Sequence, residues 1–222
     1  MPIVAIVNPK GGAGKSTAAL VLGTTLARHG ASVTAFDCDR NQPLVTWAAG
    51  DTRSALRVVS HLDPETIGRA LRGEAARQQF VIADLEGTAS MTVATAIVAA
   101  DLVLIPTRGS ITDAHQAQRA INMVEDQAAA VGARPYRLLF TCTRPGFQTR
   151  DERAIRDTFE QAGVSILPTD LGERAAYRAM FSYQLALDEL DPGAVNGVDK
   201  AIENADAFAN DVVSCIQARA AA

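Results

Sequence analysis

The feature that most restricts the fold of this chain is a glycine-rich segment near its start. Residues 8–17 read N-P-K-G-G-A-G-K-S-T, between an apolar run, Ile3–Val7, and an amphipathic stretch, Ser16–His29. A strand, a glycine-rich turn and a helix in this order leave backbone N–H groups free to point inward. The first turn of a helix also attracts negative charge. The segment therefore predicts a phosphate-binding loop rather than a turn with an incidental lysine.

The residues of this loop have separate expected tasks. Lys15 is expected to reach the β- and γ-phosphates of a nucleotide, and the Ser16 hydroxyl to bind Mg²⁺. The usual form of such a loop begins with glycine, where this chain has Pro9. The predicted nucleotide contacts in the loop are Lys10, Gly11, Gly12, Ala13, Gly14, Lys15, Ser16 and Thr17.

Short apolar runs alternate with longer amphipathic stretches along the chain. The runs predict strands at Ile3–Val7, Ser32–Phe36, Phe80–Ala83, Leu102–Ile105, Arg137–Phe140 and Ser165–Leu167. The stretches predict helices at Ser16–His29, Pro64–Gln79, Thr88–Ala99, Asp113–Val131, Thr149–Ala162 and Asp199–Ala218. Such alternation predicts a doubly wound, mostly parallel sheet with helices on both faces. We expect one α/β domain over residues 1–222, with no N-terminal helix-turn-helix domain.

Composition argues against several functional classes. The apolar runs are far shorter than the roughly 20 residues that span a bilayer, and no leader precedes the first run, so a cytoplasmic protein is expected. Three widely separated cysteines argue against disulfides, zinc and a bridged iron–sulfur cluster. A net charge of −4 gives no overall attraction to nucleic acid. Residues 134–178, however, carry eight arginines against six acidic residues, so an anionic partner is expected there.

The motif K-G-G-A-G-K-S at residues 10–16 resembles that of the deviant Walker A ATPases, the ParA/MinD group. The resemblance implies that Lys10 reaches the nucleotide of a partner subunit, so that ATP joins two copies into a homodimer. Lys10 would then act in catalysis with Lys15, much as an arginine finger does. The implied cofactors are ATP and Mg²⁺. The alternative interpretation of Lys10 is a solvated surface lysine.

Carboxylates follow two of the predicted strands, at the edge where ligands bind in such sheets. The segment D-C-D at residues 37–39 is similar to the D-x-D-P-Q segment of ParA proteins, with two residues inserted before Q-P. By this resemblance Asp39 positions the attacking water and Asp37 helps to hold the metal; the alternative is that both are turn residues. F-V-I-A-D at residues 80–84 has the form of a Walker B strand, in which Asp84 binds Mg²⁺ through water or orients Ser16.

Two residues soon after Asp84 extend this comparison. Gly87 stands where the switch loop of the family offers a backbone N–H to the γ-phosphate. Glu86 is a departure, because the family more often has a small residue or proline there. It is either a second carboxylate that orients water or a loop carboxylate paired with a nearby arginine.

Segments nearer the C-terminus resemble the family more loosely. Arg144 and Pro168 lie in segments that wall the adenine pocket in relatives, so both are predicted ATP contacts. The other interpretation of Pro168 is that it only ends a strand.

Within the family, the ParA-type DNA-segregation ATPases fit best. A MinD-type membrane anchor needs a basic amphipathic helix, and residues 199–218 carry almost no cations. A nitrogenase-type reductase needs paired cysteines. The resemblance implies an ATP-bound form that associates with the nucleoid through nonspecific duplex DNA, and a ParB-like centromere-binding partner. The predicted DNA contacts are Arg174 and Arg178, then Arg150 and Arg153; the alternative is a solvated helix face.

Two other functions stay open at this point. The segment D-L-E-G-T-A-S at residues 84–90 looks like the VirC-type proteins of DNA-transfer systems, which would make this a nucleotide-gated recruitment protein. A small-molecule P-loop kinase or ligase would need no lysine acting across subunits.

Overall fold

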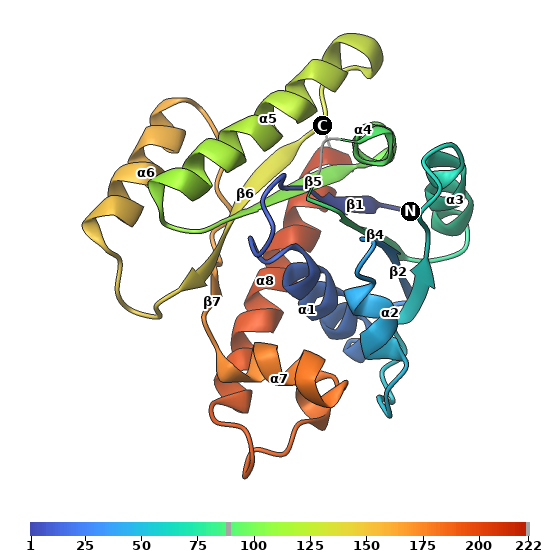
Figure 1. The fold of residues 1–222 in the computed structure, drawn as a ribbon, viewed down its shortest axis with the longest axis vertical. Helices are drawn as coiled ribbons and strands as arrows, with labels where there is room; N and C mark the ends of the chain where they lie inside the picture. The colour runs from blue at the N-terminus through green and yellow to red at the C-terminus, as the bar shows by residue number, and fades with distance from the viewer. Residues whose placement is uncertain (88–89, 221–222) are drawn as a thin grey trace.

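The computed structural model describes residues 1–87 and 90–220 and is built around a seven-stranded sheet (Figure 1). Its strands are β1 (Ile3–Ile6), β2 (Val33–Cys38), β3 (Arg57–Ser60), β4 (Phe80–Leu85), β5 (Leu102–Thr107), β6 (Tyr136–Thr143) and β7 (Leu171–Gly172). The strand order is β3-β2-β4-β1-β5-β6-β7, and neighbouring strands are parallel. The predicted doubly wound α/β fold is confirmed.

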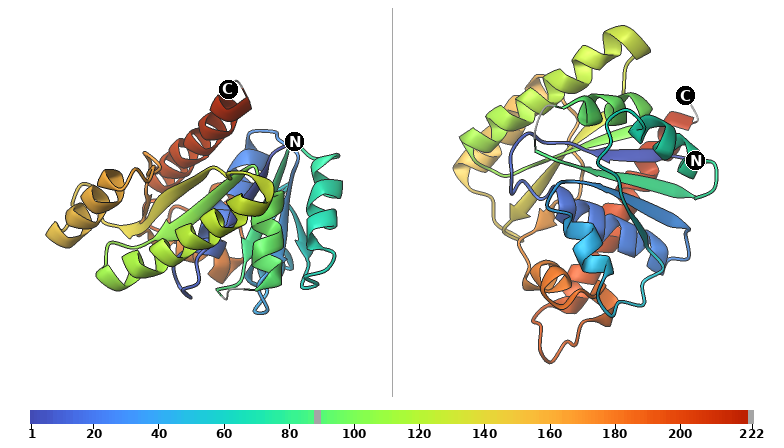
Figure 2. Two further views of the ribbon diagram at one scale, coloured as in Figure 1. Left: turned by 90° about the horizontal axis from the view of Figure 1, so that it is seen from above. Right: turned by 45° about the vertical axis from the view of Figure 1, so that its right-hand side comes forward.

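Helices cover both faces of the sheet (Figure 2). One face packs against α1 (Lys15–Arg28), α2 (Pro43–Ala48), α7 (Ala175–Tyr183), the 3₁₀ turn η1 (Leu187–Glu189) and α8 (Val198–Ala220). The other packs against α3 (Ile67–Ala75), α4 (Met91–Ala99), α5 (Ile111–Val131) and α6 (Arg150–Gln161). Successive strand residues alternate between the two cores, so Val4 joins one and Ala5 the other. This two-sided burial explains the continuous apolar runs of the sequence.

The topology brings the predicted site together at one edge of the sheet. β1 lies between β4 and β5, and the carboxyl ends of these strands point the same way. Asp84 lies opposite Ile6 of β1 on one side and opposite Asp37 of β2 on the other. The glycine-rich loop after β1 and both carboxylates therefore share the crevice where ligands bind in such sheets.

The structure differs from the sequence prediction at several elements. Ser165–Leu167 is not a strand; Ile166 makes one isolated bridge to Leu138, and Pro168 has no N–H with which to extend the pairing. The short elements α2, β3, β7 and α7 were not predicted. The predicted helix Thr88–Ala99 is observed as α4 from Met91, and Thr88 and Ala89 lie outside the described residues. None of the described helices is both long and apolar enough to cross a membrane.

Candidate nucleotide-binding site

The loop between β1 and α1 is held in shape by neighbouring strands. The buried Asn8 donates from Nδ2 to the Pro106 carbonyl at 2.6 Å and accepts from the Lys10 N–H at 2.7 Å. Thr141 Oγ1 of β6 donates to the Ala13 carbonyl at 2.8 Å. Gly12 and Gly14 have φ angles of 75° and 95°, a conformation that side chains disfavour. Because Gly14 precedes α1 and has no side chain, the first N–H groups of the helix stay free for an anion.

A cavity of about 840 Å³ opens over this loop. Six of the predicted phosphate contacts line it: Gly11, Gly12, Gly14, Lys15, Ser16 and Thr17. Asp39, Glu86 and Gly87 line it as well. Ala13 of the loop is buried, and Lys10 is not among the lining residues in the described structure. The cavity is therefore lined by residues that the sequence predicts to contact phosphate, to position the attacking water and to form the switch loop.

Lys15 and Gly87 pack closely against the loop. Lys15 is buried and donates from Nζ to the Lys10 carbonyl at 3.2 Å. Burial lowers the pKa of Lys15, and the carboxylates of Asp84 and Asp39 oppose that change. A Cβ added at Gly87 would lie 3.1 Å from the Pro9 carbonyl oxygen and 3.4 Å from Lys15 Nζ. A side chain at this position would be tightly packed against the loop, so the glycine favours the close approach of this segment.

Asp84 is the most unusual carboxylate of the site. It is fully buried, and neither side-chain oxygen has a hydrogen-bond partner among the described residues. Burial raises its pKa to about 7, and Asp37 and Asp39 add to the rise, whereas Ser16 and Lys15 oppose it. A buried carboxylate without a partner is costly unless a cation compensates it.

These surroundings fit a magnesium ion. No group of three or more His, Cys, Asp or Glu side chains is arranged as a metal cage in residues 1–87 and 90–220. Mg²⁺ in nucleotide sites instead keeps several waters and takes one or two protein oxygens plus the phosphates. The Ser16 hydroxyl and the unpaired Asp84 carboxylate are such oxygens.

The Asp37 carboxylate accepts hydrogen bonds from nearby backbone N–H groups. Its Oδ2 accepts from the Leu44 and Val45 N–H groups at 2.8 and 3.0 Å, and its Oδ1 accepts from the Asp39 N–H at 3.2 Å. Burial raises the pKa of Asp37, and these backbone bonds oppose the rise. The carboxylate thus caps the first turn of α2, an element that the sequence did not predict. That Asp37 helps to hold the metal stays a prediction. Both oxygens of its carboxylate already accept hydrogen bonds from backbone N–H groups.

Asp39 and Glu86 both face the cavity, with different partners. Asp39 accepts from the Asn41 N–H at 2.8 Å and the Asn41 amide at 3.0 Å, and it is only half-buried. Glu86 Oε2 lies 3.6 Å from Arg40 Nε. This ion pair is the one expected if Glu86 is a loop carboxylate paired with a nearby arginine.

The Lys10 side chain contacts α5 and is not among the residues that line the cavity in the described structure. Its Nζ lies 2.7 Å from Asp113 Oδ1, in the first turn of α5. Asp113 also bonds the Ser110 hydroxyl, which caps α5. Burial raises the pKa of Asp113, but the bonds from Lys10 and Ser110 outweigh it and the pKa is lowered. Sequence reasoning missed Asp113.

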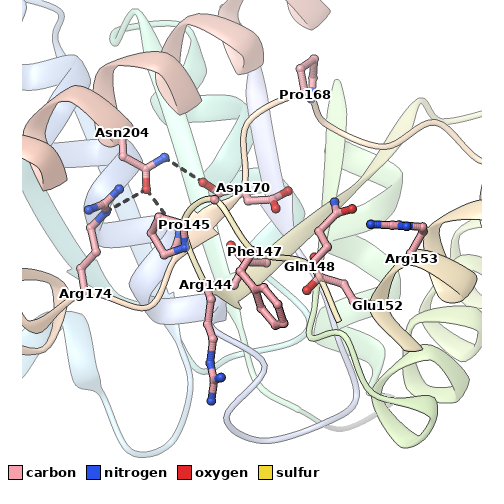
Figure 3. Close-up of a pocket in the computed structure, with 13 residues that line it drawn as sticks. Arg144, Pro145, Phe147, Gln148, Glu152, Arg153, Pro168, Asp170, Arg174 and Asn204 are labelled. Carbon is pink, nitrogen blue, oxygen red and sulfur yellow. Dashed lines mark hydrogen bonds between the residues drawn. The ribbon is translucent and has the colours of Figure 1, made fainter. Parts of the chain in front are cut away.

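The predicted adenine contacts lie in a second pocket, of about 470 Å³ (Figure 3). Arg144 and Pro168 both line it, together with Phe147 and Arg153. Asn204 of α8 closes one side by accepting from Arg174 Nε at 3.3 Å and donating to the Asp170 carbonyl at 2.8 Å. The pocket shares no lining residue with the cavity over the phosphate loop.

A slot of about 120 Å³ borders both pockets. It shares Gly172 and Arg174 with the second pocket. It shares five residues with the phosphate cavity: Gly14, Thr17, Cys142, Glu173 and Arg178. Tyr177 and Phe181 of α7 form an apolar wall. The sequence analysis did not identify these two residues. Their spacing of four residues, which places both on one helix face, was the pattern that could have indicated them. Cys142 reaches the slot because its φ of 54° lies in a bulge of β6, which no sequence pattern indicates.

The predicted DNA-contacting arginines fall into two groups. Arg178 is exposed, pairs with Glu173 at 3.2 Å and lines the phosphate cavity, and Arg174 is half-buried against Asn204. Arg150 and Arg153 are exposed on α6, at the opposite edge of the sheet from α3 (Figure 1). In the first group, Arg178 lines the phosphate cavity and Arg174 lines the slot and the second pocket. In the second group, Arg153 lines the second pocket and Arg150 lines none of the three cavities.

Comparison with known proteins decides the family. The family described as VirC1 protein matches residues 1–190. A Protein ParA of Rhizobium radiobacter is 37% identical over 211 residues, covering 94% of this chain and 95% of the relative. The chain belongs to the ParA/VirC1 family of ATPases. It is thus a ParA/MinD-type protein, as the motif at residues 10–16 predicted.

Solved structures agree with this family fold. The ATP complex of a Cyanothece McdA variant superposes with a TM-score of 0.77 at 16% identity, covering 96% of each chain. Cobyrinic acid a,c-diamide synthase of Mycobacterium smegmatis, with bound ADP and magnesium, superposes with a TM-score of 0.68 at 16% identity, covering 83% of this chain and 91% of that one. Structural neighbours of this ParA/VirC1-family chain thus bind ATP and magnesium.

Proposed function

We propose that this chain is an ATP-dependent partition ATPase that works as a nucleotide-sandwich homodimer. MgATP would lie between two copies, the dimer would bind nonspecific duplex DNA, and a ParB-like partner would reset it by stimulating hydrolysis to ADP and phosphate. Its location would be cytoplasmic, and on the nucleoid when ATP is bound. The 37% identical Protein ParA supports this function over others in the family.

The observation that carries the proposal is the direction of Lys10. Its backbone belongs to the phosphate loop, but its side chain lies outside the cavity of its own subunit and bonds Asp113. Lys15 lines the cavity and would neutralise the phosphates within the subunit. A second lysine fixed to the same loop, with a side chain that does not line this cavity, is suited to the nucleotide of another copy, where it would neutralise charge in the transition state.

Exposed apolar side chains support a dimer across the same edge. Leu62 follows β3, Met91 begins α4 and Ile111 begins α5, so all three lie at the carboxyl edge of the sheet. Each is exposed in the described structure, whereas large apolar side chains are usually buried. A second copy placed over the nucleotide would cover them.

Within one subunit, the proposed chemistry divides among four side chains. Ser16 and Asp84 hold Mg²⁺, which balances the phosphate charge when bound. Lys15 stabilises the charge that develops on the β- and γ-phosphates. Asp39, half-exposed in the cavity, orients the attacking water. The adenine ring fits the apolar slot beside Tyr177, and Arg144 and Pro168 line the pocket that continues it.

A second function, nucleotide-gated recruitment of DNA as in VirC-type proteins, is favoured by the family match over residues 1–190. Such a recruitment protein would form the same ATP-bound dimer but hydrolyse ATP only slowly. A small-molecule kinase or ligase is less well supported, because it leaves the outward Lys10 without a task.

Sedimentation of the full chain with ATP, with ADP and without nucleotide tests the proposal. We expect dimers with ATP and monomers with ADP, and monomers for Lys10→Ala under all three conditions. Lys200→Ala is the matched control, because Lys200 is the third lysine of the chain and is exposed on α8. The same mass with either nucleotide would refute the sandwich. An ATPase assay with and without DNA separates the partition and recruitment functions.

DNA binding is best tested on α6. Arg150→Glu with Arg153→Glu should flatten the slope of log affinity against log salt by about one unit for each DNA phosphate that the variant no longer binds. Arg69→Glu with Arg72→Glu is the control, because these two arginines are exposed with the same spacing on α3, at the other edge of the sheet. Equal slopes for both double variants and wild type would assign Arg150 and Arg153 to a solvated face. Arg174 and Arg178 line the slot, and Arg153 lines the pocket that continues it, so Arg150→Glu alone is the variant that leaves the proposed nucleotide contacts intact.

A further inference from the structure

We propose that Arg108 is a specificity-determining residue that distinguishes ATP from ADP, through a contact between its guanidinium and the γ-phosphate of the nucleotide in its own subunit. The inference deepens the proposed function and rests on the binding of MgATP in the cavity over the phosphate loop. Arg108 follows β5 and is not part of the motif at residues 10–16.

The fold holds the backbone of Arg108 beside the phosphate loop. Thr107, the last residue of β5, is fully buried, and its carbonyl accepts at 3.2 Å from Thr141 Oγ1, the same hydroxyl that bonds the loop. On the other side of Arg108, Gly109 packs against α6, where an added Cβ would lie 2.7 Å from Glu152 Cγ. The backbone is therefore fixed, whereas the Arg108 side chain is exposed and free to turn toward a ligand.

The Arg108 guanidinium lies beside the part of the loop that would hold the γ-phosphate. In loops of this kind the backbone N–H groups cradle the α- and β-phosphates, and the lysine reaches the β- and γ-phosphates. A Cβ added at Gly87 would lie 3.4 Å from Lys15 Nζ and 3.4 Å from the Gly11 nitrogen. A Cβ added at Gly12, the next residue of the loop, would lie 3.9 Å from Arg108 Nη2. The guanidinium and the Lys15 amine thus approach the same end of the loop.

The carboxylates of the site lie on the other side of this loop. β1 lies between β4 and β5, so residues of β4 and residues that follow β5 reach the loop from opposite sides. Asp84 belongs to β4, and Asp37 belongs to β2, the next strand on that side. The charge of a bound triphosphate would therefore be balanced by Mg²⁺ on the side of β4 and by Arg108 on the side of β5.

Arg108 also differs from the other arginines of the cavity in its partners. The arginines that line the cavity are Arg40, Arg108 and Arg178. Arg40 lies 3.6 Å from Glu86, and Arg178 lies 3.2 Å from Glu173. No ion pair or hydrogen bond of the Arg108 guanidinium is found in residues 1–87 and 90–220. Its charge is therefore available to an anion in the cavity.

Asp113 is the carboxylate that would compete for Arg108. The charge of Arg108 acts on it, but its Oδ1 bonds Lys10 and its Oδ2 bonds the Ser110 hydroxyl. A γ-phosphate offers oxygens without such partners, and a guanidinium binds phosphate with two parallel hydrogen bonds. Arg108 should therefore prefer the nucleotide.

The test compares the affinities for ADP and for a non-hydrolysable imido analogue of ATP, both with Mg²⁺. They are measured by displacement of a fluorescent nucleotide, at protein concentrations where sedimentation shows monomers. Arg108→Gln should weaken binding of the analogue about tenfold, the loss expected for one hydrogen bond between charged groups. It should leave the affinity for ADP nearly unchanged, because ADP has no γ-phosphate.

Two further variants complete the comparison. Arg108→Lys should restore part of the preference for the ATP analogue, because it keeps the charge but not the two parallel donors. Arg119→Gln is the matched control, since Arg119 is exposed on α5 and lines none of the three cavities. Arg108→Met, which keeps the apolar stem, gives the same comparison if the Gln variant folds poorly.

The outcomes separate the inference from the proposed function. Equal losses for both nucleotides overturn the inference, because Arg108 then shapes the loop or binds the phosphates that ADP shares with ATP. Unchanged affinities in the folded variants also overturn it, because Arg108 is then a solvated side chain. A loss that appears only at concentrations where dimers form overturns it as well, since Arg108 then contacts the nucleotide of the other copy. Wild-type protein that binds neither nucleotide refutes the proposed ATPase itself, and the inference fails with it.

Discussion

The Asp84 carboxylate should destabilise the ligand-free protein, so Asp84→Asn is expected to raise stability while removing the response to Mg²⁺ and ATP. Asp84 is buried in β4, and its oxygens have no hydrogen-bond partner among the described residues. Burial raises its pKa from 3.8 to about 7. An ionised carboxylate at this position is desolvated in the folded protein but hydrated in the unfolded chain, so its charge lowers the free energy of unfolding.

The magnitude follows from this pKa. Below pH 3.8 the group is protonated in both states and contributes nothing. Between pH 3.8 and about 7 the unfolded chain has lost a proton that the folded protein keeps, so stability falls as pH rises. At about 1.4 kcal/mol per pKa unit, the loss is roughly 1.5 kcal/mol near pH 5 and roughly 4 kcal/mol above pH 7. An unpaired Asn costs about 1–3 kcal/mol itself, so the net gain near pH 8 is on the order of 2 kcal/mol.

Urea unfolding without Mg²⁺ or nucleotide, at about pH 5 and pH 8, measures this effect. The stability difference between Asp84→Asn and wild type should grow by about 2–3 kcal/mol from the lower to the higher pH. Asp126→Asn, exposed on α5, should show no such growth. Adding MgATP should raise the midpoint of wild type and leave that of Asp84→Asn nearly unchanged. A difference that is flat with pH, or an Asn variant less stable than wild type near pH 8, would refute the reasoning.

Three further predictions concern catalysis and the loop. Lys15→Ala should abolish ATP binding, because it removes the buried cation of the cavity; calorimetry with unaltered affinity would contradict this. Asp39→Ala should still bind ATP but hydrolyse it about 10²–10⁴-fold more slowly. Glu86→Ala should keep most of the turnover, because Glu86 pairs with Arg40. A steady-state assay in which Glu86→Ala is slow and Asp39→Ala is not would assign the water-orienting role to Glu86. Gly87→Ala should weaken ATP binding by about 1 kcal/mol or more, since its Cβ would lie 3.1 Å from the Pro9 carbonyl oxygen; equal dissociation constants would show that the switch segment can shift freely.

Strands β1, β2 and β4 and the phosphate loop could be predicted because their signals are local. Gly11, Gly12 and Gly14 next to Lys15 restrict the backbone itself, and residues 3–7 and 80–83 are continuous apolar runs. The short elements carry weaker signals. β3 has two half-buried valines at the sheet edge, and α2 is capped by Asp37, which lies outside the helix on β2. Neither element could be assigned from its own sequence.

The sequence by itself determined the fold class and most of the phosphate site, because periodicity and glycine spacing act over a few neighbouring residues. The tertiary structure alone decided which side chains meet. Lys10 and Asp113 are 103 positions apart, and the slot beside Thr17 depends on a bulge at Cys142 and on two side chains of α7. Parallel strands joined by long crossovers bring such residues to one sheet edge. No local sequence pattern indicates which of their side chains will be in contact.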